Sequence, residues 1–191
     1  MADFTLSSGS YIRPYLHPFG SPPMRDFQES TCATTGLIKA GHVVTCDTHA
    51  DTSYFRIRRE GIGTTLASTC IWGVAAEAST SDGSTTGLPT LSNRRINVWL
   101  ADPYTEFQCY STGAIASTLQ GTARALRYDS TLNIHLLDYG NSSRQDHRIV
   151  VTRLLASPGD TNAPVAFRFL KGPVGLDSTV SSAVSYLAGG W

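Results

Sequence analysis

The stretch that decides the fold is Arg95-Ile96-Asn97-Val98-Trp99-Leu100-Ala101-Asp102-Pro103. In its first half, apolar side chains alternate with polar ones, which is the pattern of a strand with one buried face. The Asp102-Pro103 pair then ends the strand, because proline fixes φ and cannot donate to a sheet ladder. We therefore expect a strand over 95–100 that is followed by a turn.

Strand-like runs continue to the end of the chain, and each is bounded by Gly, Pro, Asp or Asn. Between them there is no long segment with the 3.6-residue period of a helix, apart from one possible helical turn near 114–119. This spacing predicts an antiparallel sandwich or barrel rather than βαβ units. The last segment, from Val180 to Leu187, fits a helix face and an edge strand equally well. The runs span residues 105–112, 124–128, 132–139, 148–155 and 165–170.

A second group of strand-like runs precedes the first stretch. Residues 37–45 are typical of two strands joined by a turn at Ala40-Gly41. Residues 54–59 and residues 70–76 are each typical of a single strand. The Ser-, Thr- and Gly-rich residues 79–93 predict a flexible boundary. The residues that we expect inside the β body are Phe55, Ile57, Ile71, Val98, Leu132, Ile134, Val151, Phe167 and Phe169.

The first thirty residues differ from the rest because they hold four of the nine prolines, interleaved with aromatic residues. Proline disfavours a helix or a central strand, whereas a solvated linker does not require aromatic side chains. We expect an extended arm that lies on its own body or on a neighbouring subunit. The fold class is therefore all-β, an antiparallel β-barrel or sandwich body with an extended N-terminal arm. The expected division is 1–30 as the arm, 31–80 as a small β-barrel-like subdomain, 81–93 as a flexible linker and 94–191 as a second antiparallel β subdomain with a C-terminal segment.

The expected arm carries the candidate partner-binding residues. Aromatic side chains supply rigid apolar area, and arginines can bind carboxylates or carbonyl oxygens of a neighbouring subunit through two hydrogen bonds. If the arm binds a partner, deleting 1–30 should leave the β body folded and weaken attachment. If it packs only on its own domain, the deletion should lower the melting temperature instead. The candidates are Tyr11, Arg13, Tyr15, Phe19, Arg25 and Phe27.

The composition narrows the possible partners. The 191 residues carry a net charge of zero, with 13 Arg against 2 Lys, and include 21 Ser and 22 Thr. Zero net charge argues against a disordered polyelectrolyte and against a protein that mainly neutralises nucleic-acid phosphates. A surface rich in Arg, Ser and Thr and poor in Lys suits contact with other proteins.

The cysteines and the N-terminus predict where the chain is made. The four cysteines, Cys32, Cys46, Cys70 and Cys109, form no C-x-x-C pair, and the first residues lack the basic start and apolar core of a signal peptide. We expect synthesis in a reducing cytoplasm, with free, buried thiols. No apolar run reaches the length needed to span a bilayer, so we expect no membrane association.

No recognised catalytic motif occurs in the chain. None of the five histidines belongs to an H-E-x-x-H motif, so we expect each of them at the surface or half-buried. Asp146-His147 lacks a G-x-S-x-G nucleophile elbow to complete a triad, and Gly61-Ile62-Gly63 lacks the third glycine of a dinucleotide fingerprint. We therefore expect a protein without enzymatic activity, metal or cofactor.

Two blocks of sequence resemble virion proteins of tailed bacteriophages. Residues 36–78, with Lys39-Ala40-Gly41, Val43-Val44 and Gly73-Val74-Ala75-Ala76, resemble the barrel of small capsid decoration (cement) proteins. Residues 98–107, 122–132 and 148–152 are similar to structural proteins of environmental and cyanobacterial phages. The expected arm and the final segment have no counterpart.

The resemblance implies a non-enzymatic protein that is made in the host cytoplasm and sits on the outside of an icosahedral head. It would bind the major capsid protein, reinforce contacts between its subunits and associate as a homotrimer. A carbohydrate- or receptor-binding module of a head appendage or fibre is the alternative, in which Trp72, Trp99 or Tyr104 would stack on a sugar. A hydrolase is the third class, which serine-directed probes would test.

Overall fold

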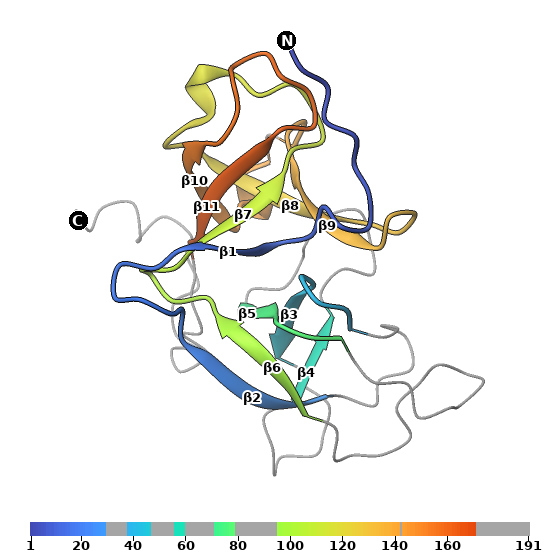
Figure 1. Cartoon of the computed structure of the whole chain (residues 1–191), viewed down its shortest axis with the longest axis vertical. Helices are drawn as coiled ribbons and strands as arrows, with labels where there is room; N and C mark the ends of the chain where they lie inside the picture. Colours follow the sequence, from blue (N-terminus) through green and yellow to red (C-terminus); the bar gives the residue numbers. More distant parts are fainter. Residues whose placement is uncertain (30–37, 47–55, 60–70, 79–94, 142, 171–191) are drawn as a thin grey trace.

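Eleven β-strands and two short 3₁₀ turns make up the regular structure of the part of the chain that the structure describes. The computed structural model describes residues 1–29, 38–46, 56–59, 71–78, 95–141 and 143–170. No α-helix occurs within these ranges, so the predicted all-β class is confirmed. Figure 1 shows the strands in two bodies that lie one above the other, with β1 running along the boundary between them.

The first body is a closed barrel of five strands in the order β2-β4-β3-β5-β6, with β6 pairing back onto β2. Neighbouring strands are antiparallel except β2 and β4, which are parallel. Apolar side chains from all five strands fill the interior, as the alternation in Arg95–Leu100 requires. The strands are β2 (Met24–Glu29), β3 (Val43–Cys46), β4 (Arg56–Arg59), β5 (Ile71–Ala75) and β6 (Arg95–Leu100).

The second body is a six-stranded antiparallel sheet in the order β1-β7-β11-β10-β8-β9. The sheet curls, so that β9 reaches the end of β7 through a parallel bridge between Ser111 and Leu137. The turns η1 (Ser117–Leu119) and η2 (Arg144–Asp146) connect its strands. The strands are β1 (Arg13–Leu16), β7 (Glu106–Tyr110), β8 (Ala123–Asp129), β9 (Ile134–Asp138), β10 (Ile149–Leu154) and β11 (Pro164–Phe169).

One apolar core continues from the second body into the wall of the barrel. Phe107, Phe167 and Phe169 form its aromatic centre, with ring centroids 5.2–5.9 Å apart. Val43 and Val74 of the barrel belong to the same buried cluster. Burial of each large side chain stabilises the fold by about 1.5–3 kcal/mol, so this shared core holds the two bodies together.

Glycine is required where the chain approaches itself closely. A Cβ on Gly73 would lie 1.9 Å from the Trp99 carbonyl oxygen, so β5 and β6 can pair here only without a side chain. Gly41 has φ +82°, and a Cβ there would lie 2.6 Å from the Tyr11 side chain. Gly41 belongs to the turn that the Ala40-Gly41 pair predicted.

The boundary between the bodies differs from the predicted one. The sequence places the change at 81–93 and assigns residues from 94 onward to the second subdomain, whereas β6 pairs with β2 and β5 of the barrel. After β1, the chain stays in the barrel from β2 to β6 and returns to the second body between Leu100 and Glu106. The local pattern of β6 cannot show this, because its partners lie far away in the sequence. The predicted linker residues 81–93 lie outside the described residues.

The N-terminal segment also differs from an arm that extends beyond the body. Residues 13–16 form the edge strand of the second body, and residues 24–29 form a strand of the barrel. Pro14 fits in β1 because an edge strand can lack an N–H donor. Deletion of 1–30 would therefore remove an edge strand and a barrel strand, so we expect it to lower the melting temperature, as an arm packed on its own domain predicts.

The structure bears out most of the other predicted strands and core residues. Strands occur in each of the runs predicted after residue 94, and η1 lies in the predicted helical turn. Leu132 is only half-buried, whereas Phe55, the expected C-terminal segment beyond 170 and three of the four cysteine side chains lie outside the described residues. The predicted core residues that are buried are Ile57, Ile71, Val98, Ile134, Val151, Phe167 and Phe169.

Candidate functional site

Two of the described segments cross between the two bodies, and they lie side by side. Residues 17–23 lead from β1 to β2, and residues 101–105 lead from β6 to β7. The Leu100 N–H donates to the Pro23 carbonyl oxygen at 2.9 Å and ties the second crossing to the first. Side chains of both crossings are therefore brought to one part of the surface.

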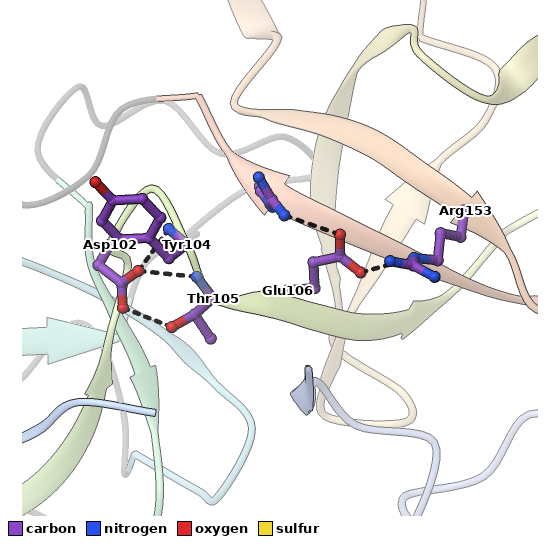
Figure 2. A network of polar contacts seen from close by, with 6 residues as sticks. Asp102, Tyr104, Thr105, Glu106 and Arg153 are labelled. Carbon is purple, nitrogen blue, oxygen red and sulfur yellow. Dashed lines mark hydrogen bonds and ion pairs between the residues drawn. The ribbon is translucent and has the colours of Figure 1, made fainter. Parts of the chain in front are cut away.

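The second crossing is a turn that is fixed by Asp102. One carboxylate oxygen accepts the N–H groups of Tyr104 and Thr105 at 2.6 and 2.8 Å. The other accepts the Thr105 hydroxyl at 2.5 Å. Figure 2 shows the Asp102 carboxylate at the centre of this turn, beside the Tyr104 ring. Because the backbone at 104 is held in this way, the Tyr104 ring is presented at the surface, where the residue is 50% exposed.

The first crossing is a turn rich in proline. Pro18, Pro22 and Pro23 fix φ on both sides of Phe19, and Gly20 takes φ +105°. Phe19 is 77% exposed and its ring lies edge-on to the ring of Tyr104, with centroids 5.7 Å apart. A loop that is restricted by proline loses little entropy when it binds a partner.

The two crossings carry a patch of exposed apolar side chains. Leu16 pairs with Glu106 at the start of β7, and Met24 pairs with Trp99 near the end of β6, so both flank the crossings. Within the described ranges, every exposed large hydrophobic residue except Met1 belongs to this group. We call it the crossing patch, and its residues are Tyr15, Leu16, Phe19, Met24 and Tyr104.

A buried carboxylate anchors β7 directly behind the second crossing. Glu106 is 3% exposed and accepts hydrogen bonds from Arg153 of β10 and Arg168 of β11, both at 3.1 Å. The pairing of Glu106 with Arg153 is seen in Figure 2. These contacts tie the first residue of β7 to two other strands, so the crossing starts from a fixed point.

The six predicted partner-binding residues differ in how exposed they are and in what they contact. Tyr15 and Phe19 lie in the crossing patch, and Arg13 is exposed on β1. Arg25 is exposed but lies over the ring of Phe27, 5.7 Å from its centroid.

The other two aromatic candidates pack against the protein itself. Phe27 is 4% exposed and packs against Trp72 in the barrel core, so it is not available to a partner as the sequence suggested. Tyr11 is half-buried against Gly41.

Sequence reasoning missed part of the patch and two buried histidines. Strict alternation would bury either Tyr15 or Leu16, but the register of β1 against β7 shifts between Pro14 and Leu16, and both are exposed. His42 and His135 are fully buried, whereas the sequence placed each histidine at the surface or half-buried. No local signal reveals this burial, because their surroundings come from distant segments.

The described residues offer an apolar contact surface rather than a recognised chemical centre. Among them, no group of three His, Cys, Asp or Glu residues could hold a metal ion. Cys109 is a free thiol that is completely buried, and burial raises its pKa, so it is not poised as a nucleophile. Within the same ranges, no helix combines the length and the apolar character that a bilayer crossing requires.

Comparison of the chain with protein-family models, with curated proteins and with solved structures finds no match.

Proposed function

We propose that this chain is a non-enzymatic structural protein of a phage virion, which binds the outside of an icosahedral head and stabilises contacts between major capsid protein subunits. The observation that carries the proposal is the crossing patch, where exposed large apolar side chains lie on two adjoining turns and on the strand ends that flank them. The resemblance of residues 36–78 to capsid decoration proteins suggests the major capsid protein as the partner. The similarity of residues 98–107 to structural proteins of environmental and cyanobacterial phages agrees with a virion protein.

The composition of the patch supports a protein partner. Tyr, Phe and Met are enriched in the cores of protein interfaces, and a few such anchors carry most of the binding free energy. Phe19 and Tyr104 already hold each other edge-on, and both crossings are braced by proline or by Asp102. Because these side chains and turns are already ordered, binding a partner costs little conformational entropy.

The charge at the margin of the patch supports a capsid surface that offers carboxylates or carbonyl oxygens. Arg13 is exposed on β1, three residues before Leu16 in the chain. Arg153 and Arg168 bind Glu106 with side chains that are 53% and 39% exposed. Arginine at an interface margin binds such oxygens through its planar fork of donors.

The proposal includes a cyclic homotrimer on the capsid exterior after synthesis in the host cytoplasm. A β protein with sheet edges can hide them against symmetry mates, and closed point-group symmetry is the common solution. Light scattering of the purified protein at micromolar concentration should return the mass of a trimer. A monomer in the absence of heads would remove this part of the proposal.

The alternative of a carbohydrate-binding module would use the exposed Tyr104 ring as a stacking platform. Sugar sites also need polar side chains beside the aromatic ring to bind hydroxyl groups. Both carboxylate oxygens of Asp102, which lies in the same turn as Tyr104, are already occupied by hydrogen bonds within the turn. Trp72 and Trp99 are packed against the apolar cores. The capsid proposal is therefore favoured, and a glycan array separates the two.

Co-sedimentation with phage heads assembled without the protein tests the proposal. Phe19→Ser and Tyr104→Ser remove exposed apolar area, and each should weaken head binding by about tenfold or more on the usual scale of interface anchors. Their melting temperatures should stay close to that of the unmodified protein, because Phe19 is 77% and Tyr104 50% exposed.

Arg144→Ser is the matched control, because Arg144 is exposed on η2, next to β8 at the far side of the sheet from β1. It should leave head binding unchanged. If the double variant Phe19→Ser/Tyr104→Ser still decorates heads at full occupancy, the crossing patch is not the binding surface.

A further inference from the structure

A polar cluster with two buried histidines at its centre joins the barrel to the hairpin that β8 and β9 form. Its barrel side comes from the 39–42 turn and from β4, and its other side comes from β8, β9 and the turn between them. The aromatic and imidazole rings of the cluster lie 5.2–5.7 Å from one another. The residues of the cluster are Lys39, His42, Arg59, Tyr128, Asn133 and His135.

The hydrogen bonds of His42 define its protonation state. Its Nδ1 accepts the Lys39 backbone N–H at 3.0 Å, and a backbone N–H can only donate. Nδ1 is therefore bare, and Nε2 carries the proton that it donates to the Asn133 carbonyl oxygen at 2.9 Å. The ring is fully buried and bridges the two bodies as a neutral imidazole.

His135 repeats this arrangement from the opposite side. It lies on β9 and is fully buried, and its Nδ1 accepts the Val43 backbone N–H of the barrel at 3.2 Å. The two imidazoles lie edge-on, with centroids 5.5 Å apart. Each body thus contributes one imidazole to the contact between them. In both rings an unprotonated Nδ1 accepts a backbone N–H of the barrel.

The rest of the cluster is already occupied by further contacts. Arg59 donates to the Tyr128 hydroxyl at 2.9 Å and lies over its ring, 4.3 Å from the centroid. The Tyr128 hydroxyl in turn donates to the side chain of Asn133. Asn133 takes φ +58°, and Asp129 holds the turn before it by accepting the N–H groups of Thr131 and Leu132.

The charged groups that act on His42 oppose protonation of its imidazole ring. They are Arg59 from β4 and Lys39 from the 39–42 turn, and both are cationic. From the second body, the groups that face it are Tyr128, Asn133 and His135. None of these is a carboxylate, so an imidazolium at this position would have no counter-charge among them.

We propose that His42 and His135 form an acid-sensitive joint, in which proton uptake by either imidazole separates the β8–β9 hairpin from the barrel. A proton on Nδ1 places an N–H donor against the backbone N–H that Nδ1 now accepts, so the hydrogen bond is replaced by repulsion between two donors. At His135 the lost bond is the one from Val43, which crosses the joint. At His42 it is the bond from Lys39, which holds the barrel turn that presents the ring to Asn133. Acidification thereby loosens one specific contact between the bodies. This inference does not depend on the proposed function.

The position of the His42 titration supports an acid rather than a neutral trigger. Burial, assisted by the charges of Arg59 and Lys39, lowers the pKa of His42 to about 4, against the opposing effect of the hydrogen bond to Asn133. The joint therefore stays closed near neutral pH and opens as the pH approaches 4. The shared apolar core around Phe107 does not titrate and keeps the bodies attached.

Amide hydrogen exchange of the full chain at pH 7 and pH 4, corrected for intrinsic rates, tests the joint. The amides of Lys39 and Val43 should lose protection at pH 4 by about tenfold more than the amides of β10 and β11. His42→Asn and His135→Asn keep an acceptor for the backbone N–H but cannot be protonated. Each variant should retain that protection at pH 4 for the N–H that its own side chain accepts.

His147→Asn is the matched control, because His147 lies outside the cluster, beside η2. At pH 4 this variant should lose protection at the amides of Lys39 and Val43, as the unmodified protein does. Nitrogen-15 spectra of the unmodified protein provide a second test that needs no variant. They should show His42 protonated at Nε2 alone at pH 7 and titrating below pH 5. An ordinary titration near pH 6.5, or equal loss of protection in the Asn variants, would overturn the proposal.

Discussion

The ring of Phe19 stands edge-on to the ring of Tyr104, with centroids 5.7 Å apart and planes at 74°. The two residues come from different connections between the same two β bodies. Each ring therefore restrains the other, and the pair is the centre of the exposed apolar patch that we assign to head binding. Changes that disturb either turn should act on partner affinity through this pair.

Replacing Asp102 by Ala should weaken both the fold and the patch. The carboxylate accepts two N–H groups and a hydroxyl, and losing such charge-assisted bonds at a partly exposed turn should lower the free energy of unfolding by about 1–2 kcal/mol. Head affinity should fall as well, because the backbone of Tyr104 is no longer fixed. Urea unfolding and co-sedimentation measure the two effects. Asp102→Asn keeps an acceptor oxygen, so a loss as large as that of the Ala variant would contradict the assigned role.

Replacing Gly73 by Ala should disrupt the barrel. The added Cβ would lie 1.9 Å from the Trp99 carbonyl oxygen, and backbone atoms on paired strands cannot move aside cheaply. We expect a loss of more than about 3 kcal/mol in the free energy of unfolding, or no folded protein. Gly140→Ala has no atom within 4 Å of the new Cβ and should change stability by less than about 0.5 kcal/mol. Equal melting temperatures for the two variants would show that β5 and β6 are not this close.

Replacing Glu106 by Gln should cost more than breaking an ion pair at the surface. Glu106 is 3% exposed, but Arg153 and Arg168 reach solvent, so we expect a loss of about 1–2 kcal/mol rather than the 3–5 kcal/mol typical of fully buried pairs. Asp26→Asn breaks the exposed pair with Arg95 and should cost about 0–1 kcal/mol. Denaturant unfolding at low and high salt separates them. Only the Asp26 effect should disappear in high salt, and a Glu106 effect that is screened equally would show that this carboxylate is accessible to solvent.

The strands could be predicted from the sequence because alternation is a local property. The pattern of Arg95–Leu100 follows from its own side chains, and the structure confirms that Ile96 and Val98 face the core. The sequence predicts a barrel but not the strands that close it, because closure depends on the pairing of Phe27 with Ile96 across a long stretch of chain. The same pairing places Phe27 in the core, although its proline-rich surroundings indicated an exposed arm.

The candidate site could be predicted only in part from the sequence, for a similar reason. Tyr15 and Phe19 are conspicuous among prolines, whereas Leu16 is exposed only because the register of β1 shifts. The burial of His42 depends on Asn133, which a different part of the chain supplies. Local patterns thus identify strands and unusual residues, and contacts between distant segments decide which of these residues face solvent.

Stability should fall in acid because His42 is buried as a neutral imidazole. Its pKa is about 4 in the folded protein against 6.5 for the ordinary side chain, so above pH 6.5 neither state is protonated at this group. Between pH 6.5 and 4 the unfolded chain binds a proton that the folded protein does not, and the free energy of unfolding should fall by ~3 kcal/mol. Below pH 4 this group causes no further loss.

Urea unfolding at steps between pH 7.5 and 3.5 measures this dependence. His147, whose pKa is lowered by partial burial and by Arg124, adds a smaller slope in the same direction. His42→Asn should therefore flatten most of the slope and His147→Asn only a little. A slope that His42→Asn leaves unchanged would contradict the assigned state of the ring.

A cryo-electron microscopy map of phage heads decorated with the purified protein tests the central claim most directly, since it shows which face of the chain meets the capsid. The account predicts that the crossing patch, with Phe19 and Tyr104 at its centre, lies against the major capsid protein at joints between its subunits. Bare heads at saturating protein, or a bound protein whose crossing patch faces solvent, would contradict it.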